Sequence, residues 1–86
     1  MTYRVILSQD AEKDLAILDK STRIRIIIRL ESIREHPQNY VKRLVGVPLY
    51  SLRVGDYRVI LDIKNKEIII FVVKVGHRSK VYNGLS

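Results

Sequence analysis

Two short turns in the second half of the chain constrain its fold most strongly. Gly55-Asp56 separates the strand-like segments 49–54 and 57–63, and Lys64-Asn65-Lys66 separates 57–63 from the apolar segment 67–75. Connections this short join antiparallel neighbours, because a parallel return needs a crossover of a dozen or more residues. The order Gly-Asp suits a type II′ turn, which takes glycine at its first central position. The three segments therefore form a meander, and segment 67–75, apolar on both faces, belongs in the middle of the sheet.

The first half of the chain predicts one strand and two helices. Residues 3–7 are β-branched and alternate loosely, as in a strand. Ser8 can cap a helix with acids in its first turn, where the helix dipole favours negative charge. Ser21 or Thr22 can cap a second helix that runs to about His36, where a proline follows. Two helices so close in sequence are expected to pack as an antiparallel hairpin.

The order of these elements predicts an α+β fold for residues 1–86, taken as one domain. It comprises a twisted, mainly antiparallel sheet with the helical hairpin on one face, in the order β-α-α-β-β-β, and residues 37–48 form a loop. The chain contains no cysteine, so disulfides and thiolate metal sites are excluded. No apolar run approaches the ~20 residues that span a bilayer, and the first residues lack a signal-peptide pattern. These features predict a cytoplasmic protein with no membrane partner.

Positive charge is concentrated in the second half of the chain. The net charge is +7, with seven Lys/Arg against six Asp/Glu in residues 1–39 and nine against three in residues 40–86. Such an asymmetry points to nucleic acid or an acidic partner. The alternative is that the positive charge serves only to keep the protein soluble.

Arg53 and Arg58 flank the first turn and are expected to face each other across it. Paired positions beside a tight turn bring side chains within about 5 Å on one face. Two guanidinium groups at that separation repel unless an anion is shared, and their planar fork suits phosphate oxygens. The alternative is that both are solvated and paired with Asp56 or Asp62.

A second basic cluster follows the long apolar strand. If extended geometry continues beyond it, Lys74, Gly76, Arg78, Lys80 and Tyr82 share one face, by the two-residue period. That face has three cations, one aromatic ring and no acid, and Tyr82 is suited to stacking on a base. The alternatives are a solvated charged surface and a tyrosine that only anchors the C-terminal segment.

Histidine offers the remaining candidate for proton transfer. His77 lies on the opposite face under the same geometry, and an ordinary hydrogen-bonded histidine is the better interpretation of it. His36 lies at a helix end, where its charge suits the dipole, and we expect no catalytic role for it. With two histidines and no acids at ligand spacing beside them, no metal site is expected. The chemistry therefore rests on arginine, tyrosine and histidine.

These motifs, in this order, resemble the RelE/ParE superfamily of toxins from toxin–antitoxin systems. The residues that carry the resemblance are Ser8, Ala11, Leu15, Pro37, Arg43-Leu44-Val45-Gly46, Gly55-Asp56-Tyr57-Arg58-Val59-Ile60, Val75-Gly76-His77-Arg78 and Val81-Tyr82. The resemblance covers nearly the whole chain. It implies a microbial-RNase-like fold and a ribosome-dependent ribonuclease that cuts messenger RNA in the A site. The implied reaction is attack of the 2′-hydroxyl on the adjacent phosphorus without a metal or other cofactor, leaving a 2′,3′-cyclic phosphate.

The resemblance also assigns roles to residues. Arg58 and Arg78 would stabilise the phosphate, with Arg78 near the leaving group, and Tyr82 would stack on or orient the nucleotide. Arg53 takes a basic strand position of the family. The residues expected to bind RNA are Lys42, Arg43, Lys74, His77 and Lys80.

One departure from the family concerns the general base. Some members carry two lysines, one residue apart, on the strand before the hairpin, where this chain has Ser51 and Arg53. Serine is not comparably basic, and arginine stays protonated. Tyr82 or His77 can take the place of the base, or positioning by the ribosome can carry most of the rate.

Three functions remain open at this point. The first is the RNA-cleaving toxin, whose partners are the ribosome, messenger RNA and a RelB-like antitoxin with an acidic, amphipathic segment. The second is the ParE branch, a non-catalytic poison of DNA gyrase on the same fold. The third is an RNA-binding module without catalysis, for which binding should depend steeply on salt.

Overall fold

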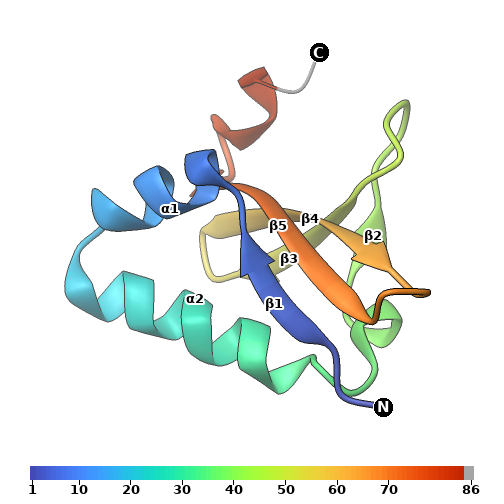
Figure 1. Cartoon of the computed structure of the whole chain (residues 1–86). Helices are drawn as coiled ribbons and strands as arrows, with labels where there is room; N and C mark the ends of the chain where they lie inside the picture. Colours follow the sequence, from blue (N-terminus) through green and yellow to red (C-terminus); the bar gives the residue numbers. More distant parts are fainter. Residues whose placement is uncertain (85–86) are drawn as a thin grey trace.

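The computed structural model of the chain is a sheet with two helices on one of its faces (Figure 1). It describes residues 1–84, so the last two positions of the expected domain 1–86 lie outside it. The elements are β1 (Arg4–Leu7), α1 (Gln9–Ala16), α2 (Lys20–Ser32), the 3-10 helix η1 (Pro37–Asn39), β2 (Lys42–Arg43), β3 (Tyr50–Val54), β4 (Tyr57–Lys64), β5 (Ile69–His77) and the 3-10 helix η2 (Val81–Gly84).

The sheet of the described residues has five strands in the order β1-β5-β4-β3-β2. The pairs β2–β3, β3–β4 and β4–β5 are antiparallel, whereas β1 runs parallel to β5. The parallel pair is possible because both helices lie between β1 and the other strands in sequence. The α+β fold and the meander are thus confirmed, and the long apolar strand lies inside the sheet, between β1 and β4.

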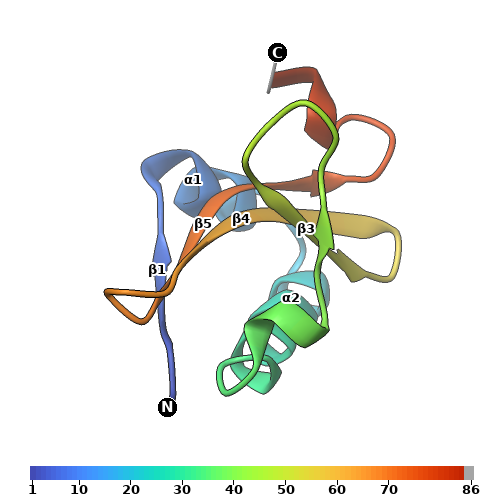
Figure 2. The ribbon, with the colours of Figure 1, turned by 90° about the vertical axis from the view of Figure 1, so that its right-hand side faces the viewer.

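The core lies between the helices and one face of the sheet, which Figure 2 shows nearly edge-on. Alternation along the strands turns Leu52, Val59 and Leu61 toward the helices, and α1 and α2 contribute Ala11, Leu15, Ile26 and Leu30 to the same cluster. α1 packs on β5 and β1, and α2 contacts β3. Over residues 1–84, no helix is long and apolar enough to cross a membrane.

The two helix starts differ in how well the sequence predicts them. Ser8 caps α1 as expected: its Oγ accepts a hydrogen bond from the Ala11 N–H at 3.0 Å and donates one to the Val73 carbonyl at 2.7 Å. For α2 the prediction of Ser21 or Thr22 is wrong. The cap is Asp19, whose carboxylate accepts bonds from the hydroxyls of both of those residues. A carboxylate competes better than a hydroxyl for the free N–H groups of the first turn.

α2 ends at Ser32, four residues before the expected His36. The reason is a tertiary contact with the first strand. The Tyr3 N–H donates to the Arg34 carbonyl at 2.8 Å, and Arg34 Nε donates to the Tyr3 carbonyl at 2.7 Å. Ending the helix early therefore joins the chain to the start of β1.

The turns and loops show one confirmation and two corrections. Gly55 has φ +59° and Asp56 has no positive φ, as a type II′ turn requires. The second turn covers residues 65–68 rather than 64–66, with Ile68 at φ +56°. The expected loop 37–48 contains η1 and the short edge strand β2, where Lys42 pairs with Ser51.

Candidate functional site

The face of the sheet opposite the helices holds a cavity of about 450 Å³. It is lined by Lys42, Arg43, Leu44, Val45, Ser51, Arg53, Arg58 and Tyr82. Because Leu52 and Val59 point into the core, strand alternation turns their neighbours Ser51, Arg53 and Arg58 to this face. The cavity is therefore built from the outward positions of β2, β3 and β4, with η2 at its side.

Arg53 and Arg58 lie directly opposite each other on β3 and β4, as expected from the turn. Nη1 of Arg58 is buried and has no hydrogen-bond partner among the described residues. The alternative of local ion pairs is not what the structure shows: Asp62 pairs with Lys64 at 3.4 Å, and no described carboxylate forms a salt bridge with either arginine. The two arginines thus hold uncompensated positive charge in the cavity.

Tyr82 reaches the cavity from η2. Its hydroxyl lies 3.3 Å from Ser51 Oγ, and the residue is 40% exposed. Val81, which is 2% exposed, anchors η2 on the sheet above Gly76. A Cβ on Gly76 would lie 3.3 Å from Val81 Cβ, so the missing side chain is what allows this close approach. Tyr82 is therefore presented above Ser51 by an anchored segment.

The edge strand β2 supplies the other cations of the cavity. Lys42 and Arg43 are exposed and line it, as the prediction of RNA contacts requires. Arg43 Nη1 donates to the Tyr50 hydroxyl at 3.4 Å, and its guanidinium lies 5.7 Å from the centre of that ring. The tyrosine holds the arginine in place without neutralising its charge.

The second basic cluster does not form one extended face, because β5 ends at His77 and the chain turns there. The Lys80 N–H donates to the His77 carbonyl at 2.9 Å, and the Arg78 N–H donates to the Asp56 carbonyl at 2.8 Å. Only Tyr82 of this cluster lines the cavity. Arg78 and Lys80 are exposed beyond the end of β5, so their predicted roles remain predictions.

Lys74 and His77 also lie apart from the cavity lining. Lys74 Nζ lies 3.8 Å from Asp14 of α1, so the expected acid-free surroundings of this lysine are wrong. The same carboxylate accepts the Val75 N–H at 2.9 Å. The His77 ring packs edge-on against Tyr57 at 5.7 Å between centres, and its Nδ1 lies 2.9 Å from the Ser79 hydroxyl.

The sequence reasoning missed two apolar residues of the site. Leu44 and Val45 line the cavity, and Val45 is 100% exposed. They lie where the chain leaves β2, and the Leu44 N–H donates to the Leu49 carbonyl at 3.0 Å. The signal available was Gly46, whose φ of +84° marks a tight turn beside the basic pair. Apolar surface here is suited to contact with a base or sugar.

No group of three His, Asp or Glu side chains able to hold a metal ion is found within residues 1–84. The site's donors are guanidinium, ammonium and hydroxyl groups. Chemically, such a set can bind phosphate oxygens and stabilise negative charge that develops on them.

Comparison with known proteins places the chain in a family. The model of the ParE toxin of type II toxin–antitoxin systems, parDE, matches residues 5–82. A RelE-like toxin protein of Escherichia coli is 31% identical, with 96% of this chain and 93% of that protein covered. The mRNA interferase toxin RelE of Escherichia coli is 27% identical over the same shares.

A solved structure shows the same relationship. The crystal structure of the archaeal RelE–RelB complex from Pyrococcus horikoshii superposes with a TM-score of 0.76 at 31% identity, covering 93% of this chain and 99% of that one. The family model spans nearly all of the chain, and the relatives match over 93% or more of their own length, so the comparisons of sequence and of structure point to the same family. The chain belongs to the RelE/ParE superfamily of type II toxin–antitoxin toxins, and its relatives place it in the RelE branch.

Proposed function

We propose that this toxin is a ribosome-dependent endoribonuclease that cleaves messenger RNA in the A site. The observation that carries the proposal is the buried, unpartnered Nη1 of Arg58, opposite Arg53 in a cavity beside Tyr82. A polar group left unpaired in this way is costly unless a ligand satisfies it. The relative named mRNA interferase toxin RelE supports the choice of RNA.

The proposed reaction forms a bond between the 2′-oxygen and phosphorus and breaks the bond from phosphorus to the 5′-oxygen. The 2′-hydroxyl gives its proton to a base, and the departing 5′-oxygen takes a proton from an acid. The products are a 2′,3′-cyclic phosphate and a 5′-hydroxyl. Negative charge grows on the non-bridging oxygens during attack, and Arg58 and Arg53 stabilise it by charge-assisted hydrogen bonds.

Tyr82 takes the position of the base in this proposal. It is the titratable side chain of the cavity that is not a lysine or arginine, and its ring can also stack on a nucleobase. Ser51 beneath it can relay or hold the proton through the hydroxyl pair at 3.3 Å. His77 is the weaker candidate, since its ring packs on Tyr57. Arg78, tied by its backbone to the turn between the two arginines, is proposed to reach the leaving group from the rim.

The proposed partners are the ribosome, messenger RNA and an antitoxin, and the cytoplasm is the location proposed with them. The relative from Pyrococcus horikoshii was solved as a complex of RelE with RelB, which supports an antitoxin of that kind. We expect acidic residues of the antitoxin to neutralise the arginines of the cavity.

Primer extension on a defined messenger RNA bound to ribosomes with an empty A site tests the proposal. The variants are Arg58→Met and Arg78→Ala, and the matched control is Arg4→Met, which removes an exposed arginine on β1. The expected result is a cut within the A-site codon by the wild type and the control, lost in the two site variants. No cut by the wild type, or an unchanged cut by Arg58→Met, contradicts the proposal.

Gyrase inhibition is the second candidate, because the matching family model is that of the ParE toxin. It predicts inhibition of DNA supercoiling without any RNA product. A protein that binds RNA with steep salt dependence and produces no cleavage on ribosomes would instead be the non-catalytic module. A supercoiling assay and RNA binding, run beside primer extension, separate the three functions.

A further inference from the structure

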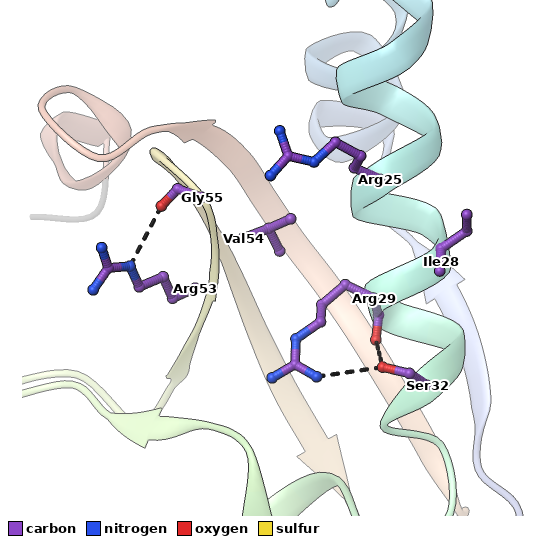
Figure 3. Close-up of a pocket in the computed structure, with 7 residues that line it drawn as sticks. All are labelled: Arg25, Ile28, Arg29, Ser32, Arg53, Val54 and Gly55. Carbon is purple, nitrogen blue, oxygen red and sulfur yellow. Dashed lines mark hydrogen bonds between the residues drawn. The ribbon is translucent and has the colours of Figure 1, made fainter.

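A second basic cavity lies on the other side of β3, between α2 and the β3–β4 turn (Figure 3). Its volume is about 370 Å³. Arg25 reaches into it from α2 toward the turn at Gly55, Arg29 reaches into it one helical turn further along α2, beside Ser32, and Arg53 extends from β3 on the opposite side of the strand. Ile28 and Val54 complete its wall, and no carboxylate lines it.

The two arginines that α2 contributes to this cavity make few bonds to the rest of the described chain. Neither Arg25 nor Arg29 forms a salt bridge in the part of the chain that the structure describes. Among the described residues, the Arg29 side chain makes a single hydrogen bond, 3.4 Å to Ser32 Oγ, and its guanidinium lies 5.3 Å from the centre of the Tyr40 ring. Arg25 has no side-chain hydrogen bond within residues 1–84, and its Nη2 lies 3.1 Å from where a Gly55 Cβ would be. Like charges four residues apart also destabilise a helix, so a shared anion would relieve the arrangement.

Arg53 lines both cavities, so they adjoin at β3. β2 pairs with β3 only at Tyr50 and Ser51. The outer edge of β3 beyond Ser51 therefore has no strand partner among the described residues, and no described strand separates the two cavities there. A polyanion bound at Arg58 can pass around this open edge, beside Arg53, to reach Arg25.

We propose that the cavity between α2 and the β3–β4 turn, with Arg25 and Arg29 in its wall, is a second phosphodiester site, which binds RNA backbone outside the cleavage cavity. Guanidinium groups donate two parallel bonds to phosphate oxygens, and the apolar wall accommodates a sugar. The inference rests on the proposed function in taking RNA as the ligand. Messenger RNA and ribosomal RNA offer the same group, and the experiment separates them.

The test measures binding of fully 2′-O-methylated RNA oligonucleotides, which 2′-hydroxyl attack cannot cleave, over a series of lengths and salt concentrations. Arg25→Gln should reduce the slope of log affinity against log salt by about 0.7, the value for one phosphate contact to a single strand. In the same variant, the longest oligonucleotides should no longer bind more tightly than the shorter ones. Arg4→Gln is the control of equal charge change on the exposed face of β1, and Arg25→Lys, which keeps the charge, should retain most of the slope.

Ribosomes provide the second arm. A loss of affinity by Arg25→Gln only on ribosomes that carry messenger assigns the phosphate to messenger RNA. A loss that also appears on ribosomes without messenger assigns it to ribosomal RNA, and either result supports the site. An oligonucleotide slope equal to that of Arg4→Gln, together with unchanged ribosome binding, overturns it.

Poly-glutamate of matched charge is the third arm. Loss of its binding by Arg25→Gln with RNA binding intact overturns the proposal in favour of an acidic polypeptide. The readout is independent of cleavage. A wild type that never cuts RNA but shows the expected loss of slope refutes the proposed nuclease and leaves the second site standing.

Discussion

Replacing Arg58 by methionine should stabilise the fold while abolishing RNA cleavage. Arg58 places a buried nitrogen with no partner opposite a second arginine, Arg53, on the neighbouring strand. Methionine keeps an unbranched apolar stem of similar length and removes both the unpaired donor and the repulsion. The substitution therefore separates the contribution of Arg58 to RNA cleavage from its contribution to the stability of the fold.

The magnitude follows from two contributions. An unsatisfied buried donor costs about 1–3 kcal/mol. Like charges directly opposite on adjacent strands add a few tenths to about 1 kcal/mol. After some lost packing of the guanidinium, a net gain of about 1–2 kcal/mol in the free energy of unfolding is expected. For a chain of 86 residues this raises Tm by roughly 5–10 °C.

Urea unfolding measures the free energy of unfolding, with Arg53→Met as the matched control. Arg53 is exposed, and its Nε donates a 3.4 Å hydrogen bond to the Gly55 carbonyl, so its replacement removes the repulsion and one weak exposed bond and should gain less than about 1 kcal/mol. Sulfate, which can occupy the phosphate position, should stabilise the wild type more than Arg58→Met, because only the wild type has the Arg58 guanidinium in the cavity. A loss of more than about 1 kcal/mol in Arg58→Met would refute the reasoning and make Arg58 a structural residue.

Three further predictions concern the tyrosine, its anchor and a helix cap. Tyr82→Phe should keep RNA affinity but slow cleavage about 100-fold or more, as for loss of an acid–base group; an unchanged single-turnover rate would remove the hydroxyl from the chemistry. Gly76→Ala should push against Val81, 3.3 Å from the new Cβ, and lower the free energy of unfolding in urea by about 1 kcal/mol while also lowering the cleavage rate. If neither the free energy nor the rate changes, η2 shifts freely. Hydrogen bonds, chiefly from the Thr22 hydroxyl, lower the pKa of Asp19 from 3.8 to about 2. Its carboxylate therefore stabilises the fold above pH 3.8 and loses this effect as the pH falls through 2, so Asp19→Ala should flatten the dependence of stability on pH between 4 and 2.

Local chemistry explains which elements the sequence predicts well. Gly55-Asp56 determines the hairpin, and strand alternation then determines which side chains face the core. Tertiary contacts explain the errors. The contact between Tyr3 and Arg34 ends α2 early, and pairing with Ser51 makes a strand of Lys42–Arg43, which alone shows no strand pattern. No local signal records either contact.

The same distinction applies to the site. Arg53 and Arg58 could be placed together because a short turn relates them. The path of the segment after His77 could not be predicted, because it depends on the hydrogen bond from Arg78 to the distant Asp56 and on the burial of Val81. Asp14 is far in sequence from Lys74, which it approaches in the fold. The arginines of α2 are likewise far in sequence from the β3–β4 turn beside which they lie. Only the fold brings them together.

The parallel pairing of β1 with β5 has a consequence for synthesis of the toxin. β5 pairs with both β1 and β4, yet it is translated after every other described strand of the sheet. A nascent chain that ends before residue 69 has the helices, β3 and β4 but not β5, so β1 has no strand to pair with, and contacts this distant in sequence form slowly. The five-stranded sheet therefore cannot form until β5 has been made. An antitoxin already present then has time to meet the chain as it folds, before the arginine cavity is complete.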